Sequence, residues 1–450
     1  MTNNEPKNVL LIGLTSIKLG GLEHGNIGNF LIIDPLFKYI RNSFPKINLR
    51  TSLQLSEGFA KKYNLTILRD KRFWTYKLNT IFSSLIDLII IIIYKILKKL
   101  FKIEIRKFLE KRILLKELTW ADIVLDFSGD LFGDNAPFQR FLEGSAKLLF
   151  AYYLEKPIIM IASSPGPFEK NFIYKWLGKF ILNKVTLILN REPTSTEYLL
   201  KIGIKKEKVI NTACPSFLFD MNPEESVMDL FSREGIDFVK PSVGIVISGW
   251  NMATPPFDKT PRKRDELNRF IPIIDFFLNQ NQQVLLISHS YRLDKFGKVI
   301  PGPDSIICEQ LYELVENINK QDHLKIIRGI YKPEEMRKII GNLDFLVSGR
   351  LHAAISGLSQ GVPTVIIDYG FEPRGHKLLG VSKLMCIEDL FCDPNNPEDM
   401  LERINKGWQF KSYYKEKIIA QLIKVEWSAR NNFEILQLFL EKKEINVNEF

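Results

Sequence analysis

An arginine and a histidine two residues apart are the strongest candidates for chemistry in this chain of 450 residues. They stand in Val347-Ser-Gly-Arg350-Leu-His352, where we expect a buried strand to end and a helix of small residues to begin. The N–H groups and the dipole of a helix N-terminus favour a bound anion, and they normally lower the pKa of a histidine. A bound phosphate would raise the pKa of His352 again and keep a proton available. The alternative is a capping histidine beside an arginine that pairs with Asp344 or Asp368.

Further groups that could bind an anion also follow predicted strands. Arginine presents a planar fork of donors that matches phosphate and carboxylate, and Arg191 stands directly after the predicted strand 186–189. A charged residue at this place could equally belong to the start of a helix. The other candidates at strand ends are His289, Tyr369, Arg374, His376 and Lys377.

Aspartates and a loop with several glycines complete the candidate chemistry. In Asp126-Phe-Ser-Gly-Asp130-Leu-Phe-Gly-Asp134, the carboxylates could orient sugar hydroxyls, bind a metal or accept a proton. Turns and helix caps use the same residue types. The loop 13–28 contains five glycines, and its last part includes Asn26 and Gly28. Its N–H groups could hold a phosphate or a sugar, although a structural turn is the alternative.

Strands that alternate with helices must position these residues. In the first half we predict buried strands at 9–12, 123–127, 158–162 and 186–189, and helices at 34–43, 139–153 and 194–202. In the second half we predict strands at 243–248, 283–288, 324–327, 345–348 and 364–367, and helices at 264–279, 305–319, 333–340, 352–360 and 411–441. This alternation predicts an α/β fold with parallel sheets, in which ligands bind at the carboxyl ends of the strands.

The same pattern predicts two Rossmann-like domains that face a cleft. We assign residues 1–225 to the N-terminal domain, with a helical insertion, basic and apolar, at 60–118. Residues 240–410 form the C-terminal domain, and a helical tail follows at 411–450.

Composition narrows the class of protein. With 45% hydrophobic and 25% charged residues, the chain is typical of a folded globular protein. The net charge of +10 favours an anionic partner without identifying it. Four cysteines without a Cys-x-x-Cys pair argue against a disulfide framework or a metal site, and we find no nucleic-acid-binding motif. The N-terminal residues lack the pattern of an export signal, which predicts a cytoplasmic protein.

Segment 81–117 combines an apolar stretch with a basic one. Residues 81–94 are very apolar but are interrupted by Asp87, and the uncharged run falls short of the about 20 residues of a membrane span. From Lys95 to Glu117, nine basic and three acidic residues give a net charge of +6. This composition is typical of helices that lie on anionic lipid headgroups, so we expect peripheral association with the inner face of the cytoplasmic membrane. The alternative is a solvated helical hairpin that packs its apolar side on the domain.

Several of these motifs, taken in order, resemble the polysaccharide pyruvyl transferase family. The resemblance covers most of residues 8–390, and Glu372 stands where many members have a lysine, so Arg374 or Lys377 is expected to replace it. Phe127-Ser128-Gly129 stands in place of three glycines. The matching segments are Gly25-Asn-Ile-Gly28, Asp122 to Asp134, Ser164-Pro-Gly-Pro-Phe168, Arg191-Glu192 with Ser195, Arg350-Leu-His352, and Gly361-Val-Pro363 leading to Tyr369.

The resemblance implies a GT-B-like fold and a specific reaction. A pyruvyl group passes from phosphoenolpyruvate to two hydroxyls of a sugar, in a cell-surface polysaccharide or a lipid-linked precursor, without a cofactor. On this interpretation His352 protonates the methylene carbon of the donor, while Asp126 or Asp130 positions or deprotonates a sugar hydroxyl. The donor and acceptor are then bound by Arg191, Arg350, Arg374 or Lys377, with Tyr369, Asn26, Gly28 and His289.

Two alternatives from other classes stay open at this stage. One is a glycosyltransferase that uses a sugar nucleotide, since the fold alone does not separate it from a pyruvyl transferase. The other is a non-catalytic, membrane-associated scaffold for polysaccharide assembly.

Overall fold

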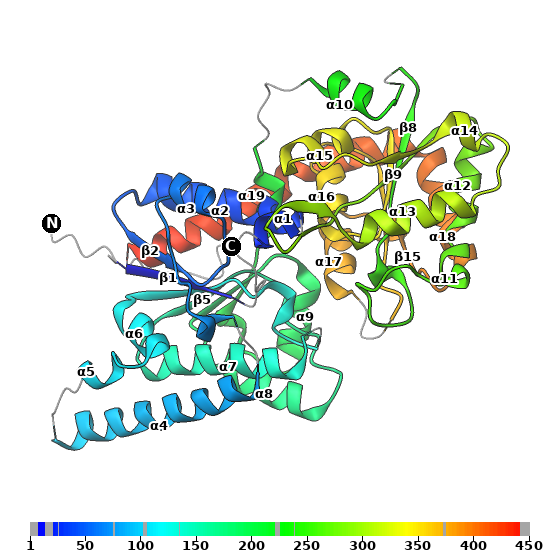
Figure 1. Cartoon of the computed structure of the whole chain (residues 1–450). Coiled ribbons are helices and arrows are strands. Elements are labelled where there is room, and N and C mark those ends of the chain that lie inside the picture. The colour runs from blue at the N-terminus through cyan, green and yellow to red at the C-terminus, as the bar shows by residue number, and fades with distance from the viewer. Residues whose placement is uncertain are drawn as a thin grey trace. The chain divides into compact units, whose positions relative to one another are not determined.

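The computed structural model of the chain divides into two units, each built on a parallel sheet (Figure 1). It describes residues 8–13, 21–25, 27–74, 77–101, 106–134, 136–220, 226–237, 239–371 and 375–441. Unit 1 comprises Met1–Leu22, Leu36–Cys214 and Ser428–Phe450, and unit 2 comprises Glu23–Pro35 and Pro215–Trp427.

Seven parallel strands form the sheet of unit 1, in the order β3-β2-β1-β4-β5-β6-β7. Their apolar side chains are buried because helices cover both faces of the sheet (Figure 1), as expected for a parallel sheet. The strand order reverses between β1 and β4, and a ligand site is expected at that point. The strands are β1 (Asn8–Ile12), β2 (Asn48–Thr51), β3 (Thr66–Ile67), β4 (Ile123–Asp126), β5 (Ile158–Ser163), β6 (Leu187–Asn190) and β7 (Val209–Asn211).

The helices of this part of the chain range from one turn to six. Helix α2 crosses the boundary, since its residues to Pro35 belong to unit 2 and those from Leu36 to unit 1. The helices are α1 (Gly21–Gly25), α2 (Ile27–Ser43), α3 (Glu57–Lys62), α4 (Leu78–Phe101), α5 (Arg106–Leu109), α6 (Ile113–Trp120), α7 (Phe138–Tyr153), α8 (Phe172–Leu182) and α9 (Pro193–Lys201).

Unit 2 repeats the same topology with six parallel strands. Their order is β12-β9-β8-β13-β14-β15, and the reversal falls between β8 and β13. A small antiparallel pair, β10 (Tyr291–Leu293) with β11 (Val299–Pro301), stands apart from this sheet. The sheet strands are β8 (Ser242–Val246), β9 (Gln283–Ile287), β12 (Leu324–Ile327), β13 (Phe345–Ser348), β14 (Thr364–Ile367) and β15 (Phe391–Cys392).

The predicted helices of the second half are all present, whereas α10, α14, α17 and α18 were not predicted. The predicted helix 264–279 is two helices in the structure, α11 and α12. The helices are α10 (Val227–Arg233), α11 (Arg264–Asn268), α12 (Ile271–Leu278), α13 (Pro303–Leu314), α14 (Lys320–His323), α15 (Pro333–Gly341), α16 (Leu351–Leu358), α17 (His376–Leu384), α18 (Pro397–Gln409) and α19 (Lys411–Leu440).

The boundaries of the units differ from those predicted. Residues 23–35 belong to unit 2 rather than to the N-terminal domain, and 428–450 belong to unit 1 rather than to a separate tail. Both differences arise because continuous helices, α2 and α19, pass from one unit to the other. In unit 1, Phe433 of α19 stacks on Tyr39 of α2 with ring centroids 4.3 Å apart. Contacts of this kind determine which unit a segment packs on. The hydrophobic periodicity of the segment does not reveal them.

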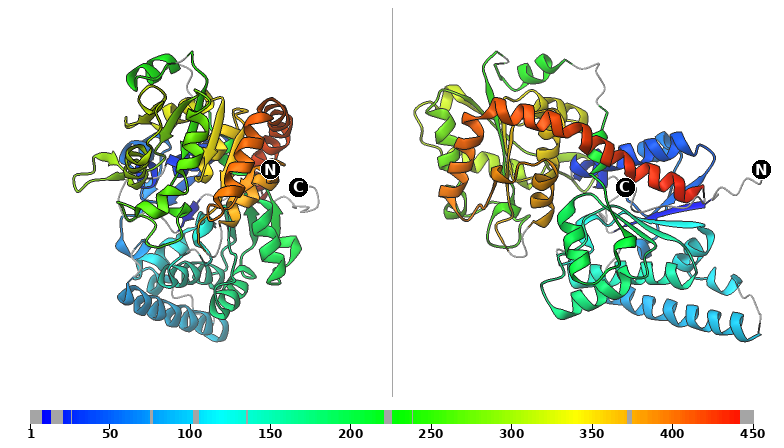
Figure 2. Two further views of the ribbon diagram at one scale, coloured as in Figure 1. Left: turned by 90° about the vertical axis from the view of Figure 1, so that its right-hand side faces the viewer. Right: turned by 180° about the vertical axis from the view of Figure 1, so that it is seen from behind.

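Helix α4 lies along the rim of unit 1, as the views in Figures 1 and 2 agree. Asn79–Leu100 is long and apolar enough to cross a membrane by length and composition, although the sequence criterion excluded this. Asp87 within it is buried at 1% exposure. Its Oδ1 accepts a hydrogen bond from Nε of Arg112 at 2.6 Å, and its Oδ2 lies 3.3 Å from Nη2 of Arg72. These ion pairs attach one face of α4 to the rest of the unit.

Asp87→Ala should therefore lower the free energy of unfolding by about 3 kcal/mol, since it leaves two guanidinium groups without their shared buried carboxylate. Chemical denaturation measures this loss. The matched control is Glu57→Ala, which removes an exposed ion pair with Arg69 and should cost less than about 1 kcal/mol. Equal stability of the two variants would show that the buried pairs do not fasten α4.

Candidate functional site

Part of the candidate chemistry lies where the strand order reverses in each sheet. In unit 1, Gly13 follows β1 and Asp126 ends β4. In unit 2, Ser248-Gly-Trp-Asn251 follows β8 and Arg350 follows β13. Both sheets thus place part of their candidate chemistry at the position where open α/β folds bind ligands.

Asp126 is a buried carboxylate with a raised pKa. Its side chain accepts hydrogen bonds from the Ser128 backbone N–H at 3.2 Å and from the Ser128 hydroxyl at 2.7 Å. Burial raises the pKa of Asp126 to about 6, although the bonds from Ser128 and the charge of Lys147 act in the opposite direction. A carboxyl group of this pKa is ionised at neutral pH and can accept a proton.

The other two aspartates of the loop differ in role. Asp134 accepts hydrogen bonds from the N–H groups of Glu169 and Lys170, at 2.5 and 3.0 Å, so it organises the next loop. Asp130 is partly exposed, and its Oδ1 lies 4.0 Å from Nη2 of Arg191. The structure therefore brings Asp126, Asp130 and Arg191 to the same edge of the sheet and gives Asp134 a structural contact.

Arg191 is a buried guanidinium, 4% exposed, at the end of β6. Its Nε donates to the Ser164 hydroxyl at 2.8 Å, and its backbone N–H donates to the Ser163 carbonyl at 2.9 Å. Strand β5 is irregular just before these serines, where Ala162 has a φ of 50° and the register shifts. Such bulges commonly redirect a strand end next to an active site.

Arg350 pairs with Asp304. This pairing was not predicted from the Arg350-Leu-His352 motif. Its Nε and Nη2 contact the two carboxylate oxygens of Asp304 at 3.0 and 2.5 Å, and Asp304 is fully buried. The sequence alternative named Asp344 or Asp368 as the partner, and this was wrong. Asp344 instead accepts from the Ser242 N–H, and Asp368 accepts from the Tyr369 N–H. The bidentate pair with Asp304 holds Arg350 in a defined orientation.

His352 lies in the first turn of α16, directly against the first turn of α2. A Cβ atom added to Gly28 would stand 2.2 Å from Nδ1 and 2.6 Å from Cβ of His352. Gly28 is therefore required because its hydrogen leaves room for the imidazole. Two motifs more than 300 residues apart in sequence, Gly28 and Arg350-Leu-His352, meet in unit 2.

Gly28→Ala should consequently displace His352 and lower activity about 100-fold, the effect expected of a shift of about 1 Å in a reacting group. The measurement is kcat/KM for the reaction that the sequence motifs imply. Gly58→Ala is the control, since a Cβ there meets only the Ser56 hydroxyl at 3.9 Å. Unchanged activity of Gly28→Ala would show that the position of His352 is not critical.

His289 is buried behind Arg350. Burial and the charge of Arg350 lower the pKa of His289 to about 3, so its imidazole is neutral at physiological pH. Its Nε2 has no hydrogen-bond partner within the described part of the chain. A neutral imidazole can donate or accept a hydrogen bond from a bound ligand but holds no proton for acid catalysis.

Tyr369 and Lys377 form another part of this region. The Lys377 Nζ lies 5.4 Å from the ring centroid of Tyr369, and Phe371 stacks on Tyr369 with centroids 5.5 Å apart. Two predicted binding residues, Asn26 and Arg374, lie outside the described residues. Among the residues that are described, no group of three or more His, Cys, Asp or Glu side chains could hold a metal ion.

Sequence reasoning missed Asn251. This buried amide donates to the carbonyl oxygens of Gly349 at 3.2 Å and Asp368 at 2.9 Å, and its Oδ1 accepts from the Ser248 N–H at 2.9 Å. It joins the loops that follow three neighbouring strands, including the one that carries Arg350. The signal was available, because Ser248-Gly-Trp-Asn251 follows a predicted strand as the other candidates do.

Solved structures with known ligands share this two-unit architecture. MnaA of Staphylococcus aureus, solved with UDP, matches with a TM-score of 0.55 and 12% identity over 97% of each chain. HepE of Anabaena, solved with UDP and glucose, matches with a TM-score of 0.55 and 10% identity over 97% of this chain and 100% of that one. At these identities the likeness shows the fold alone, which is GT-B-like.

Comparison of sequences identifies the family, whereas the structural likeness identifies only the fold. Amylovoran biosynthesis protein AmsJ of Erwinia amylovora is 26% identical over 283 residues, and the match spans 62% of each of the two chains. The sequence profile of polysaccharide pyruvyl transferases matches residues 26–370, a range that contains Gly28, Asp126, Arg191 and His352. The chain belongs to the polysaccharide pyruvyl transferase family.

Proposed function

We propose that this protein transfers a pyruvyl group from phosphoenolpyruvate to two hydroxyls of a sugar, forming a ketal. A proton adds to the methylene carbon of the donor, which becomes a methyl group, and positive charge develops on the neighbouring carbon. One sugar hydroxyl attacks that carbon and loses its proton, and the carbon–oxygen bond to phosphate breaks. The second hydroxyl then attacks, loses its proton and closes the ring.

The contact of Gly28 with His352 is the observation that carries this proposal. It brings the N-termini of α2 and α16 together at one imidazole, and each helix contributes N–H groups and a positive dipole end. A phosphate bound there favours the protonated imidazole. His352 is therefore suited to deliver the proton that starts the reaction.

The donor requires further cations, because its phosphate carries about −1.5 to −2 charges, by analogy with phosphoserine, in addition to its carboxylate. Lys377 lies in the same unit as His352, and Arg191 and Arg374 are candidates from the sequence. Arg350, held by Asp304, keeps part of its guanidinium for a ligand and stays exposed at 20%.

The acceptor hydroxyl requires a base or a hydrogen-bond acceptor. We assign this role to Asp126, whose pKa of about 6 leaves it ionised at neutral pH. Asp130, partly exposed beside Arg191, is the second carboxylate that could orient a sugar hydroxyl. On this proposal the reaction requires no cofactor and takes place in the cytoplasm.

A ligand screen separates this function from its alternatives. We expect phosphoenolpyruvate to raise the melting temperature of the protein, since a ligand that binds only the native state stabilises it. UDP-glucose is the comparison, because solved relatives of the fold contain UDP. Stabilisation by UDP-glucose alone would overturn the proposal in favour of a glycosyltransferase, and stabilisation by neither ligand would favour a non-catalytic scaffold.

A second experiment tests the chemistry itself. When the protein is incubated in heavy water with phosphoenolpyruvate and aryl glycosides of common hexoses, the methyl group of the ketal should carry one deuterium. A ketal without deuterium would show that no solvent-derived proton reaches the methylene carbon.

A further inference from the structure

Helix α4 buries three polar residues and exposes eight large apolar ones. Thr80, Ser84 and Asp87, spaced by three or four residues, are 7%, 7% and 1% exposed. A helix on the surface of a water-soluble protein shows the reverse distribution. The exposed apolar side chains are Phe82, Leu85, Ile86, Ile89, Ile92, Ile93, Ile96 and Leu100, each between 43% and 67% exposed.

This orientation is fixed by specific contacts. Asp87 pairs with Arg72 and Arg112, and the Ser84 hydroxyl lies 3.3 Å from both carboxylate oxygens of Glu143 on α7. Rotating α4 to bury its apolar face would break these contacts. In Figures 1 and 2, no helix or strand among the described residues of unit 1 covers the outer side of α4. The second sequence interpretation, a hairpin that packs its apolar side on the domain, holds only for Ile91 and its neighbours, which pack into the core of unit 1, while most of the apolar side of α4 is exposed.

A cluster of lysines adjoins the C-terminal end of this apolar face. A cavity of about 690 Å³ lies between α4, α6 and the end of α7, and a neighbouring one of about 710 Å³ extends to the end of α8. Together they are lined by one glutamate, Glu155, and by six lysines. These are Lys95, Lys98, Lys99, Lys156, Lys184 and Lys208.

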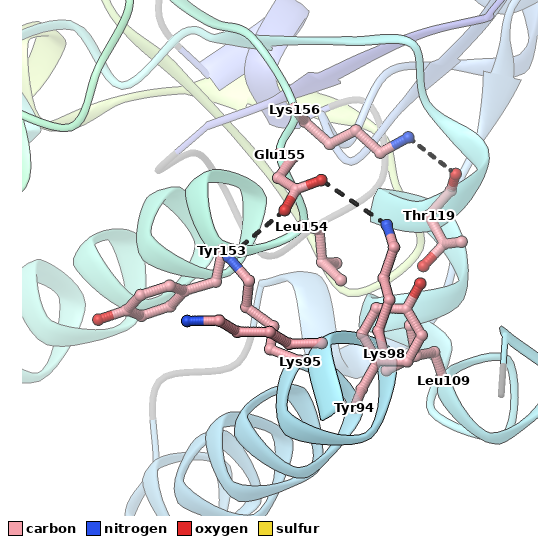
Figure 3. Close-up of a pocket in the computed structure, with 10 residues that line it drawn as sticks. Tyr94, Lys95, Lys98, Leu109, Thr119, Tyr153, Leu154, Glu155 and Lys156 are labelled. Atoms are coloured by element: carbon pink, nitrogen blue, oxygen red, sulfur yellow. Dashed lines mark hydrogen bonds and ion pairs between the residues drawn. The ribbon is translucent and has the colours of Figure 1, made fainter. Parts of the chain in front are cut away.

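Lys95 and Lys98 share one exposed acidic partner, Glu155. Figure 3 shows Lys95 and Lys98 directed toward Glu155, at 3.6 and 3.8 Å, and Lys156 directed toward the carbonyl oxygen of Thr119. The side chains of Lys95, Lys98 and Glu155 are 41%, 47% and 65% exposed, and ion pairs this exposed contribute little. A phosphate group can replace the Glu155 carboxylate as the partner of Lys95 and Lys98.

Helix α8 adds aromatic side chains to the same unit. It packs on α7, as α4 does. Phe172 and Trp176 are 75% and 57% exposed, and Trp176 stacks on Phe180 with ring centroids 5.9 Å apart. Exposed tryptophan and phenylalanine are typical of the interface between lipid and water.

We propose that α4 lies flat on an anionic phospholipid bilayer, with its apolar face among the acyl chains and the lysine cluster on the lipid phosphates. Binding to an anionic bilayer increases with the apolar area that a protein buries in it and with the positive charge that the protein places near it. A second copy of the chain fits less well, because in a two-fold contact each copy would offer the other the same six lysines and one glutamate, and so no matching negative charge. The proposal does not depend on the pyruvyl transfer reaction, since the bilayer is contacted by residues outside the candidate site.

Flotation of the full-length protein with vesicles tests this proposal. One set of vesicles contains phosphatidylcholine and phosphatidylglycerol in equal parts, and the other contains phosphatidylcholine alone. We expect binding to the anionic vesicles and much less to the neutral ones. The variant Lys98→Gln/Lys99→Gln should bind the anionic vesicles roughly 25-fold more weakly, since each lysine near such a surface contributes roughly fivefold.

The apolar face is tested with Phe82→Ser/Ile89→Ser/Ile93→Ser, which should reduce binding to background. Its control, Val239→Ser/Phe296→Ser/Ile318→Ser, changes apolar residues of unit 2 that are 83% to 94% exposed. Lys205→Gln/Lys206→Gln is the control for the charge variant. All four variants alter surface side chains, and circular dichroism checks that they fold.

Two results would overturn the proposal. One is equal vesicle binding by the α4 variant and its control. The other is that light scattering finds the wild-type protein to be a dimer and the α4 variant to be a monomer, while the wild-type protein does not bind vesicles. This result would make the exposed face of α4 a protein interface.

Discussion

His352→Ala is expected to lower kcat/KM for pyruvyl transfer by roughly 10²- to 10⁴-fold, the range typical of losing a general acid. The imidazole sits at the start of α16 against Gly28, where a bound anion would keep it protonated. Alanine removes the proton donor and is a good helix former, so α16 should remain intact. Phosphate release from phosphoenolpyruvate, measured with aryl glycosides as acceptors, gives the rate.

Two comparisons make this result specific. His323→Ala changes a histidine of α14 for which we propose no role, and it should leave the rate unchanged. His352→Gln keeps a hydrogen-bonding side chain but cannot deliver a proton at neutral pH, so it should be as slow as the alanine variant. Full activity in purified His352→Ala would remove His352 from the mechanism.

Asp126→Asn is expected to lower the rate by a similar factor and to raise stability at alkaline pH. The folded protein holds the pKa of Asp126 at about 6, above the ordinary value of 3.8, because the side chain is buried. The native state therefore favours the protonated form, and its stability falls as pH rises from about 4 through 6. Asparagine resembles that neutral form, so the variant should gain up to about 3 kcal/mol above pH 7.

The pH dependence distinguishes this result from an unspecific effect. The activity of the wild-type protein should rise with pH through an apparent pKa near 6, and the residual activity of Asp126→Asn should lack this step. The difference in unfolding free energy should disappear below about pH 4, where both side chains are neutral. A stability difference that is constant across the pH range would show that Asp126 does not titrate as its burial implies.

Buried strands of unit 2 were predictable because each is a continuous apolar run between turn residues. The strands 324–327, 345–348 and 364–367 have the same bounds in the structure as in the prediction. Six short strands were missed, which are β2, β3 and β7 of unit 1 and β10, β11 and β15 of unit 2. Asn48-Leu-Arg-Thr51 has little apolar character, and β3 has only two residues, so neither produces a recognisable pattern.

Other features depended on contacts between distant residues. Helix α2 begins at Ile27, seven residues before the predicted start, although glycine and asparagine follow at 28 and 29 and are poor helix formers. The approach of His352 explains the glycine, and no local propensity could reveal it. Asp304, the partner of Arg350, is 46 residues away in sequence and was not among the candidates.

The amino-acid sequence alone determined the alternation of strands and helices, the family and the residues at the strand ends, because these follow from local apolar patterns and short motifs. Only the tertiary structure decided which charges meet, such as Arg350 with Asp304, and which face of α4 turns inward. The physical reason is that burial and ion pairing depend on the neighbours in space. The pairing of Asp87 with Arg72 and Arg112 turns the polar face of α4 inward and leaves most of its apolar side chains exposed, although Ile91 is buried in the core.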